Sequence, residues 1–221
     1  MRQVAHGKDV KGRERRTAET ILNIIQDRGQ QQRPLDAVYR QLSNPAMDLR
    51  AYTRLYKNDG ARTPGITEET VDGMSMAQSA RIIEAIRYER WQGPPVRHIA
   101  LPKRKGGTRP LGMPTWSEKV VQEVIRSILE AYDEPPCSQH SHGFRPKKGC
   151  DTALTDIHDV WVGTKWFIEG DIKGCFAHLD HTILMHILRA NIRDHRCLRL
   201  IAGALQGGIL RSMDLPPITQ R

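Results

Sequence analysis

The segment Ser117 to Tyr132 most restricts what this chain can fold into, because its apolar residues recur with the helical period. Thr115, just before the segment, and Glu118, near its start, have the spacing of a capping box, and Pro135-Pro136 follows its end. We therefore predict that it is the strongest helix of the chain. Its apolar residues are Val120, Val121, Val124, Ile125, Ile128 and Leu129.

The pattern directly before this helix is that of a β-hairpin. Residues 96–101 alternate between apolar and polar side chains, residues 103–107 are rich in Lys and Gly, and residues 108–113 can form the returning strand. The pair Gly106-Gly107 supplies the positive φ that a tight turn needs.

The rest of the chain is mostly helical in pattern. Helices are expected around 35–42, ended by Asn44-Pro45, and over 49–56, 82–86, 151–161, 181–188 (capped by Asp180) and 194–205. Residues 165–172 have the pattern of a strand, whereas 61–75, 135–149 and the tail from 207 look irregular. The sum predicts an α+β domain with a helical N-terminal extension.

Residues 1–33 form a polar basic arm, which we interpret as mobile or marginally helical. Phosphate contact by its basic residues is the alternative; these are Lys11, Arg13, Arg15 and Arg16.

Composition indicates the class of partner. The 221 residues fit one domain or a domain plus an extension, and 34 Lys and Arg against 25 Asp and Glu give a formal charge of +9. Such a balance favours a polyanion, while no apolar run is long enough to span a membrane and the N-terminus lacks a secretory signal. We therefore expect a nucleic-acid partner and no membrane. The four cysteines form no C-x-x-C pair, so free thiols are expected.

The predicted strand at 165–172 carries a carboxylate at its end. Trp166, Ile168 and Ile172 would share one face, leaving Asp171 on the other. A carboxylate there can bind Mg²⁺, which prefers oxygen ligands, although a strand-end Asp taken alone is more often a loop cap than a ligand. Two-metal phosphoryl transfer would need further carboxylates.

The hairpin offers a possible anion site. Lys103 and Arg109 flank the glycine turn, so both can reach one anionic group, and a solvated charged tip is the alternative. The histidine pairs His140/His142 and His178/His181 have spacings that metals sometimes use. Without cysteine pairs or an H-E-x-x-H helix they are interpreted as surface or capping residues.

Seven pieces follow one another along the chain: Asn58-Asp-Gly-Ala-Arg-Thr-Pro-Gly65, Asp72-Gly73, Pro95-Val-Arg97, Leu101-Pro-Lys103, Gly107-Thr-Arg-Pro-Leu-Gly-Met-Pro-Thr115, Ser141-His-Gly-Phe-Arg-Pro146 and Glu169-Gly-Asp-Ile-Lys-Gly-Cys-Phe176. In this order they together resemble the fingers and early palm of group II intron-type (retron-type) reverse transcriptases, the maturase proteins. The resemblance covers roughly residues 35–205.

The resemblance implies roles for matching residues. Asp171 corresponds to the first catalytic aspartate, which binds the metal ions beside the backbone carbonyl of Ile172, and Phe176 to the aromatic gate that favours dNTPs. Lys103 and Arg109 match the residues that hold the incoming triphosphate, and Arg145 is given a supporting role near the nucleotide. Contact with template RNA is implied for Arg62, Thr63, Pro64, Gly65, Lys103, Arg104 and Lys105.

The implied organisation is a basic arm (1–33), a helical extension with the template loop (34–92), fingers (93–150) and a partial palm (151–221) with an incomplete ferredoxin-like sheet. The family pattern has an aspartate where Ala177 stands, and its second aspartate motif has no counterpart before Arg221. We therefore expect a fragment, inactive alone, of an RNA-directed DNA polymerase that uses two Mg²⁺ ions, dNTPs, a DNA primer, an RNA template and intron RNA. A non-catalytic intron-RNA-binding module and a degraded gene remnant are the alternatives. The expected location is the bacterial cytoplasm, in association with nucleoid or ribonucleoprotein.

Overall fold

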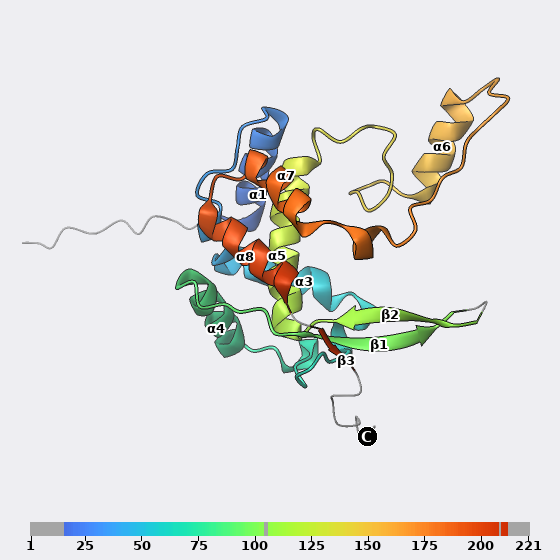
Figure 1. Cartoon of the computed structure of the whole chain (residues 1–221). Helices are drawn as coiled ribbons and strands as arrows, with labels where there is room; N and C mark the ends of the chain where they lie inside the picture. The colour runs from blue at the N-terminus through green and yellow to red at the C-terminus, as the bar shows by residue number, and fades with distance from the viewer. Residues whose placement is uncertain (1–15, 104–105, 208, 212–221) are drawn as a thin grey trace, which may run out of the picture.

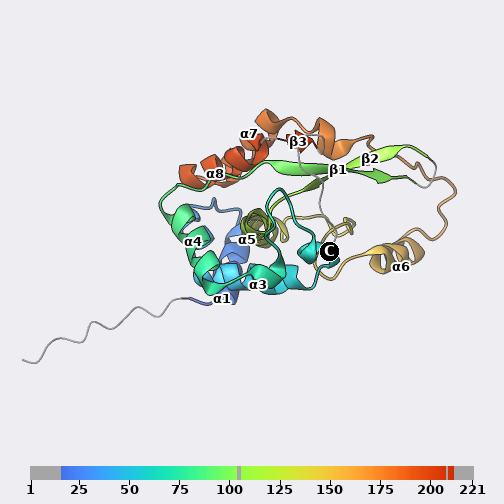
Figure 2. The same ribbon diagram turned by 90° about the horizontal axis from the view of Figure 1, so that it is seen from below.

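The computed structural model describes residues 16–103, 106–207 and 209–211. Its central element is α5 (Trp116–Asp133), which is seen nearly end-on in Figure 2. In that view α1 and α3 lie on one side of α5, and α7, α8 and the sheet lie on the other. The predicted helix over 117–132 is thus confirmed, and mixed helices and strands confirm the α+β class.

Sequence determines both the start and the buried face of α5. Thr115 Oγ1 accepts a hydrogen bond from the backbone N–H of Glu118, at 3.3 Å, which caps the helix as predicted. Trp116 is fully buried, packs edge-on against Tyr52 and donates its indole N–H to the sulfur of Met74. The helix also buries Val120, Val121, Val124, Ile128 and Tyr132.

The polar N-terminal stretch contains a packed helix, so the interpretation of residues 18–30 as a mobile or marginally helical arm was wrong. Helix α1 (Ala18–Gln30) buries Ala18, Ile21 and Ile25 and lies against α5. A Cβ on Gly29 would stand 2.0 Å from the carbonyl oxygen of Tyr132, so the close approach of the two helices requires glycine. Lys11, Arg13 and Arg15 lie outside the described residues.

Three further helices precede the hairpin in the chain: α2 (Tyr39–Leu42), α3 (Pro45–Tyr56) and α4 (Met76–Arg87). The helix predicted over 35–42 is only one turn long. Helix α2 ends at Leu42, just before Asn44-Pro45, as predicted. The same pair also begins α3, because Asn44 Oδ1 accepts from the N–H of Ala46 and Pro45 occupies the first turn. The loop between α3 and α4 contains the 3₁₀ turns η1 (Asp59–Arg62) and η2 (Val71–Gly73).

The predicted hairpin is confirmed as β1 (Val96–Pro102) paired antiparallel with β2 (Thr108–Met113). Gly106 and Gly107 have φ of 87° and 80°, as the tight turn requires. The tail, predicted to lack a pattern, includes a short strand, β3 (Ile209–Arg211), which pairs parallel with β1 and gives the order β2-β1-β3.

The C-terminal helices are α6 (Cys150–Val160), α7 (His181–Asn191) and α8 (His195–Gln206). All three agree with the predicted segments. Asp194 caps α8 through the N–H of Arg196 and also accepts from the N–H of Tyr39, at 2.8 Å, which ties α8 to α2. One hydrophobic core extends from Ala18 to Ile201 and includes residues of all four segments predicted from the sequence.

The strand predicted over 165–172 is wrong, because these residues form an exposed irregular segment. The side chains of Trp166 and Ile168 are 89% and 100% exposed. Alternation of apolar and polar residues shows only which side chains would lie on the same face of a strand. A strand also needs a neighbouring strand with which to form hydrogen bonds. None of the described residues pairs with this segment. Among the described helices, none is long and apolar enough to cross a membrane.

Candidate functional site

Asp171 lies in the exposed segment that leads from α6 toward α7. The chain then turns at Gly174, which has a left-handed φ of 63°, and forms the 3₁₀ turn η3 (Cys175–His178). His178 Nδ1 lies 2.9 Å from the carbonyl oxygen of Gly174 and fixes this turn. The side chain of Phe176 is 85% exposed, so neither it nor Asp171 is packed against a neighbouring element.

Asp180 ends this segment by capping α7, as predicted. Its Oδ1 accepts from the N–H groups of Thr182 and Ile183, at 2.7 and 3.1 Å. These backbone hydrogen bonds lower the pKa of the Asp180 carboxyl below its ordinary value. Asp180 Oδ1 is therefore engaged by the first turn of α7.

The residues around Asp171 fit a magnesium ion only in part. Mg²⁺ takes six oxygen ligands and usually keeps several waters beside one or two carboxylates and substrate phosphates. Asp171 and the carbonyl of Ile172 can supply two of these ligands. Across the described residues, no group of three or more His, Cys, Asp or Glu side chains is placed to hold a metal.

The hairpin brings Lys103 and Arg109 to the same face. Leu101 lies opposite Arg109 in the β1–β2 register, and the N–H of Lys103 donates to the carbonyl of Gly107 at 3.0 Å. Lys103 is two residues beyond Leu101, so its side chain points to the side that carries Arg109. Both side chains are exposed. The two cations thus lie on the same face of the hairpin, while Arg104 and Lys105 fall outside the described residues.

The loop at 58–73 is fixed to the start of α5. Lys119 Nζ donates to the carbonyls of Gly60 and Thr63, at 3.0 and 2.9 Å, and Ser117 Oγ lies 2.9 Å from Glu69 Oε2. Desolvation lowers the pKa of Lys119. Neither Lys119 nor Glu69 belongs to a motif in the sequence, because only the fold brings the start of α5 next to this loop.

The residues predicted to contact RNA differ in exposure within this loop. Arg62 and Thr63 are exposed, and Arg62 Nε lies 3.2 Å from Asp72 Oδ2. Pro64 is half-buried, whereas Gly65 is buried. A Cβ on Gly65 would stand 2.8 Å from backbone atoms of Pro114 and Thr115. Gly65 therefore joins the loop to the helix and presents no side chain to a ligand.

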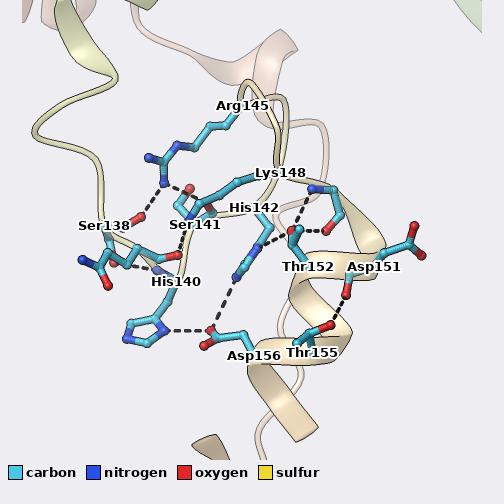
Figure 3. Close-up of polar contacts among 12 residues, drawn as sticks. Ser138, His140, Ser141, His142, Arg145, Lys148, Asp151, Thr152, Thr155 and Asp156 are labelled. Carbon is cyan, nitrogen blue, oxygen red and sulfur yellow. Dashed lines mark hydrogen bonds and ion pairs between the residues drawn. The ribbon is translucent and has the colours of Figure 1, made fainter. Parts of the chain in front are cut away.

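Arg145 organises the loop between α5 and α6 (Figure 3). Its guanidinium forms an ion pair with Glu134, at 2.7 Å, and donates to the carbonyl oxygens of Ser138 and Ser141. Hydrogen bonding to Arg145 lowers the pKa of the Glu134 carboxyl. All three guanidinium nitrogens are thus used within the loop. This arrangement agrees with a supporting position for Arg145 rather than a direct ligand contact.

His140 and His142 converge on one carboxylate of α6, which Figure 3 shows. His140 Nδ1 and His142 Nε2 lie 2.8 and 3.4 Å from Asp156 Oδ2, and His142 Nδ1 lies 2.9 Å from Thr152 Oγ1. The hydrogen bond from His140 is the main cause of the lowered pKa of Asp156. The two histidines therefore fasten the loop to α6, which agrees with their interpretation as surface or capping residues.

The structure brings the predicted residues together only in pairs. Lys103 and Arg109 share a face, and Arg62 and Thr63 share a loop, but no hydrogen bond or ion pair among the described residues joins Asp171 to the hairpin. The elements that carry the cations are fixed by α5 and the sheet. The element that carries Asp171 lacks such support.

Comparison with known proteins assigns the chain a clear set of relatives. Residues 101–214, just over half of the chain, match the family model of reverse transcriptase (RNA-dependent DNA polymerase). The group II intron-encoded protein LtrA of Lactococcus lactis is 40% identical over 79% of this chain and 29% of its own length. An uncharacterized 91 kDa protein in the cob intron of Schizosaccharomyces pombe is 41% identical over 76% of this chain and 21% of its own.

A shorter match is to nuclear intron maturase 1, mitochondrial, of Arabidopsis thaliana, which is 34% identical over 42% of this chain and 13% of its own length. The chain therefore spans less than a third of the length of each of these three relatives.

Proposed function

The chain belongs to the reverse transcriptase (RNA-dependent DNA polymerase) family, among the group II intron-encoded proteins, and from this we propose its function. We propose that it supplies the nucleotide- and template-binding part of an enzyme that extends a DNA primer on RNA. Residues 34–92 would be the extension, 93–150 the fingers and 151–221 part of the palm, with 1–33 as a segment before them. Intron RNA would be a further partner, in a ribonucleoprotein of the bacterial cytoplasm.

The observation that carries the proposal is the placement of Lys103 and Arg109 on one face of the hairpin. An incoming dNTP presents a triphosphate whose charge needs positioned cations. The Arg109 guanidinium can bind two phosphate oxygens at once, and the flexible Lys103 side chain can place its ammonium group next to another phosphate oxygen. Because β1 leads through the turn into β2 and then into α5, this cation pair is fixed to the rigid centre of the protein.

Asp171 would hold Mg²⁺ together with the carbonyl of Ile172, and the Phe176 ring would exclude a ribose 2′-hydroxyl. When bound, two Mg²⁺ ions activate the primer 3′-hydroxyl and stabilise the leaving pyrophosphate. Asp171 would hold the metal ions in place, while Lys103 and Arg109 would bind the phosphates of the substrate. Phosphoryl transfer needs mainly such positioning and electrostatic stabilisation from the protein.

Template RNA would lie along the exposed residues of the 58–73 loop. Arg62 offers a guanidinium that is 72% exposed, next to Thr63 and Pro64, and Gly65 would act by fixing the loop to α5. Lys103, Arg104 and Lys105 would extend this contact along the hairpin. Arg145 would support the nucleotide pocket by keeping the 134–149 loop in place.

A second candidate function is binding of RNA without catalysis. It is favoured by the formal charge of +9 and by the contrast between the well-supported cationic elements and the unsupported Asp171 segment. Under both functions we expect the chain by itself to extend no primer. Magnesium-dependent dNTP incorporation by residues 1–221, lost on Asp171→Ala, would overturn that expectation.

A nucleotide titration tests the proposed triphosphate site. We expect the double change Lys103→Gln/Arg109→Gln to weaken dTTP binding at least about tenfold, since charged hydrogen bonds contribute about 1.5–3 kcal/mol each. The matched control is Arg81→Gln/Arg87→Gln, which removes the same charge from exposed positions of α4. Equal affinities in the two double variants would refute the hairpin site and leave the RNA-binding function to be judged by its salt dependence.

A further inference from the structure

Helix α6 stands apart from the helices that surround α5, as Figure 1 shows, and it buries none of its residues. Its link to the core is the loop that follows α5. Arg145 ties this loop to Glu134 at the end of α5. His142 ties the loop to α6 through Thr152 and Asp156. Polar contacts, and not a buried apolar face, therefore hold α6 in place.

The hydrogen bonds around His142, drawn in Figure 3, determine which of its ring nitrogens carry protons. Thr152 Oγ1 lies 2.9 Å from the N–H of Gly149, from the carbonyl oxygen of Gly149 and from His142 Nδ1. A hydroxyl has one proton to donate and two lone pairs with which to accept. Because the carbonyl can only accept, it takes the hydroxyl proton, and His142 Nδ1 must donate a proton of its own.

The other ring nitrogen of His142 faces a carboxylate. His142 Nε2 lies 3.4 Å from Asp156 Oδ2, which also lies 2.8 Å from His140 Nδ1. Hydrogen bonding, first from His140, lowers the pKa of the Asp156 carboxyl and keeps it ionised, so both nitrogens have to donate to it. His140 can do so in its neutral form with one ring proton. His142 needs protons on both nitrogens, which only the imidazolium ion has.

We propose that His142 is a positioning residue that fastens the loop to α6 only while its ring is protonated. In a neutral ring, either Nδ1 takes the Thr152 hydroxyl proton from the carbonyl of Gly149, or Nε2 turns a lone pair toward Asp156. One contact and the attraction to the carboxylate are lost in both cases. Histidine changes its charge between about pH 5 and 8, so this contact should be closed in mild acid and loosen as pH rises.

The charges around His142 agree with a protonated ring. The charged groups near it are Asp151 and Asp156 of α6, His140, Arg145 and Lys148 of the loop, and Glu134. Asp156 is in contact with the ring and attracts the second proton. The charge of Arg145 is offset by Glu134, and Lys148 donates to the carbonyl of Gln139. Asp151 points away from the ring in Figure 3.

His142 acts on Arg145 through the backbone of the loop. The Arg145 guanidinium donates to the carbonyl oxygens of Ser138 and Ser141, and Ser141 directly precedes His142. Holding His142 on α6 therefore keeps these two carbonyls where they orient Arg145. The inference goes beyond the proposed function, and it rests on that function only in giving Arg145 a nucleotide pocket to support.

Hydrogen exchange and ring NMR of the purified chain test the inference without nucleotide or RNA. After correction for the intrinsic effect of pH on exchange, residues 149–156 should be at least about fivefold better protected at about pH 5.5 than at about pH 8.5, as expected for one charge-assisted hydrogen bond. At the lower pH both ring N–H groups of His142 should give slowly exchanging signals, because both are hydrogen-bonded.

Variants separate the protonation of His142 from a purely structural role of its partners. Thr152→Val should abolish the Nδ1–H signal and the pH dependence of protection, whereas Thr152→Ser, which keeps the hydroxyl, should retain both. Asp156→Asn should also remove the pH dependence. His158→Gln is the control, because it removes another histidine of α6, one that lies 2.7 Å from Asp159, and it should change neither readout.

Equal corrected protection at the two pH values, or pH dependence that survives in Thr152→Val, would overturn the inference. A dTTP titration of the two Thr152 variants at the lower pH tests the effect on Arg145, and equal affinities would refute the positioning role. If the exchange and NMR results are as expected but the unchanged chain binds no dTTP, the proposed function fails and the proton-dependent contact stands.

Discussion

Replacing Gly65 by alanine tests whether the loop predicted to contact template RNA is built onto α5. The added Cβ would lie 2.8 Å from the carbonyl carbon and oxygen of Pro114 and from the nitrogen of Thr115. These are backbone atoms at the capped start of the central helix, so they cannot move aside as a flexible side chain can. Overpacking at a well-packed site typically costs about 1–3 kcal/mol, and we expect a loss of that size.

Thermal and urea unfolding measure this loss. For a chain of this length, each 1 kcal/mol lowers the melting temperature by about 2–4 °C, so Gly65→Ala should melt roughly 2–12 °C lower. Gly73→Ala is the matched control, because it adds the same methyl group in the same loop with nothing within 4 Å. RNA affinity, measured where both variants are folded, should fall only for Gly65→Ala.

Equal melting temperatures for the two glycine variants would refute the reasoning, since it depends on contact with Pro114 and Thr115 and not on the loss of a glycine. A drop in both would indicate that backbone freedom of the loop, rather than its close approach to α5, limits stability.

Three further outcomes follow from single contacts. Lys119→Met should lower stability by about 1–2 kcal/mol in urea unfolding and speed hydrogen exchange in the 58–65 loop, because it removes two partly exposed charged hydrogen bonds. In the unchanged chain, burial raises the pKa of Glu118, so the native state binds more protons than the unfolded state and loses stability as pH rises above about 4.5. Glu118→Gln lacks this titration, so its stability relative to the unchanged chain should increase over the same pH range; a pH-independent difference would contradict this. Ile168→Ala should change stability by less than about 0.5 kcal/mol, whereas buried Ile128→Ala should cost about 2–5 kcal/mol. A large loss at Ile168 would mean that its segment is packed as the sequence predicted.

Helical periodicity with a polar cap was sufficient to predict most of the fold. The helices α4, α5 and α8 each join an apolar stripe to a Ser, Thr or Asp cap, and a glycine pair determines the hairpin turn. The same reasoning missed α1. Its apolar residues lie between charged ones in the sequence, and they become a buried face only when the helix packs against α5. It also predicted the end of α2 before Asn44-Pro45 but not that the same pair begins α3.

Residues of the candidate site could be proposed from the sequence, but the hydrogen-bond and ion-pair partners of these residues could not. Sequence identified Arg145, but the ion pair with Glu134 that occupies its guanidinium depends on how the 134–149 loop folds back. Lys119 and Glu118 are neighbours in sequence with opposite surroundings: one holds a surface loop and the other is buried. No local pattern distinguishes these roles, since each is decided by residues more than 20 positions away.

If Asp171 holds Mg²⁺ as proposed, binding of the metal should depend on the Asp171 segment pairing into a sheet. Fixing the backbone of residues 165–172 in one conformation costs roughly 1–2 kcal/mol per residue, or about 8–16 kcal/mol in total. One carboxylate bound to Mg²⁺, which keeps most of its waters, cannot offset a cost of that size. Hydrogen bonds from neighbouring strands and burial of Trp166 and Ile168 are the interactions that can. Magnesium alone should therefore leave the segment unprotected from hydrogen exchange, whereas any partner that pairs with it should order Asp171 and create the metal site in the same step.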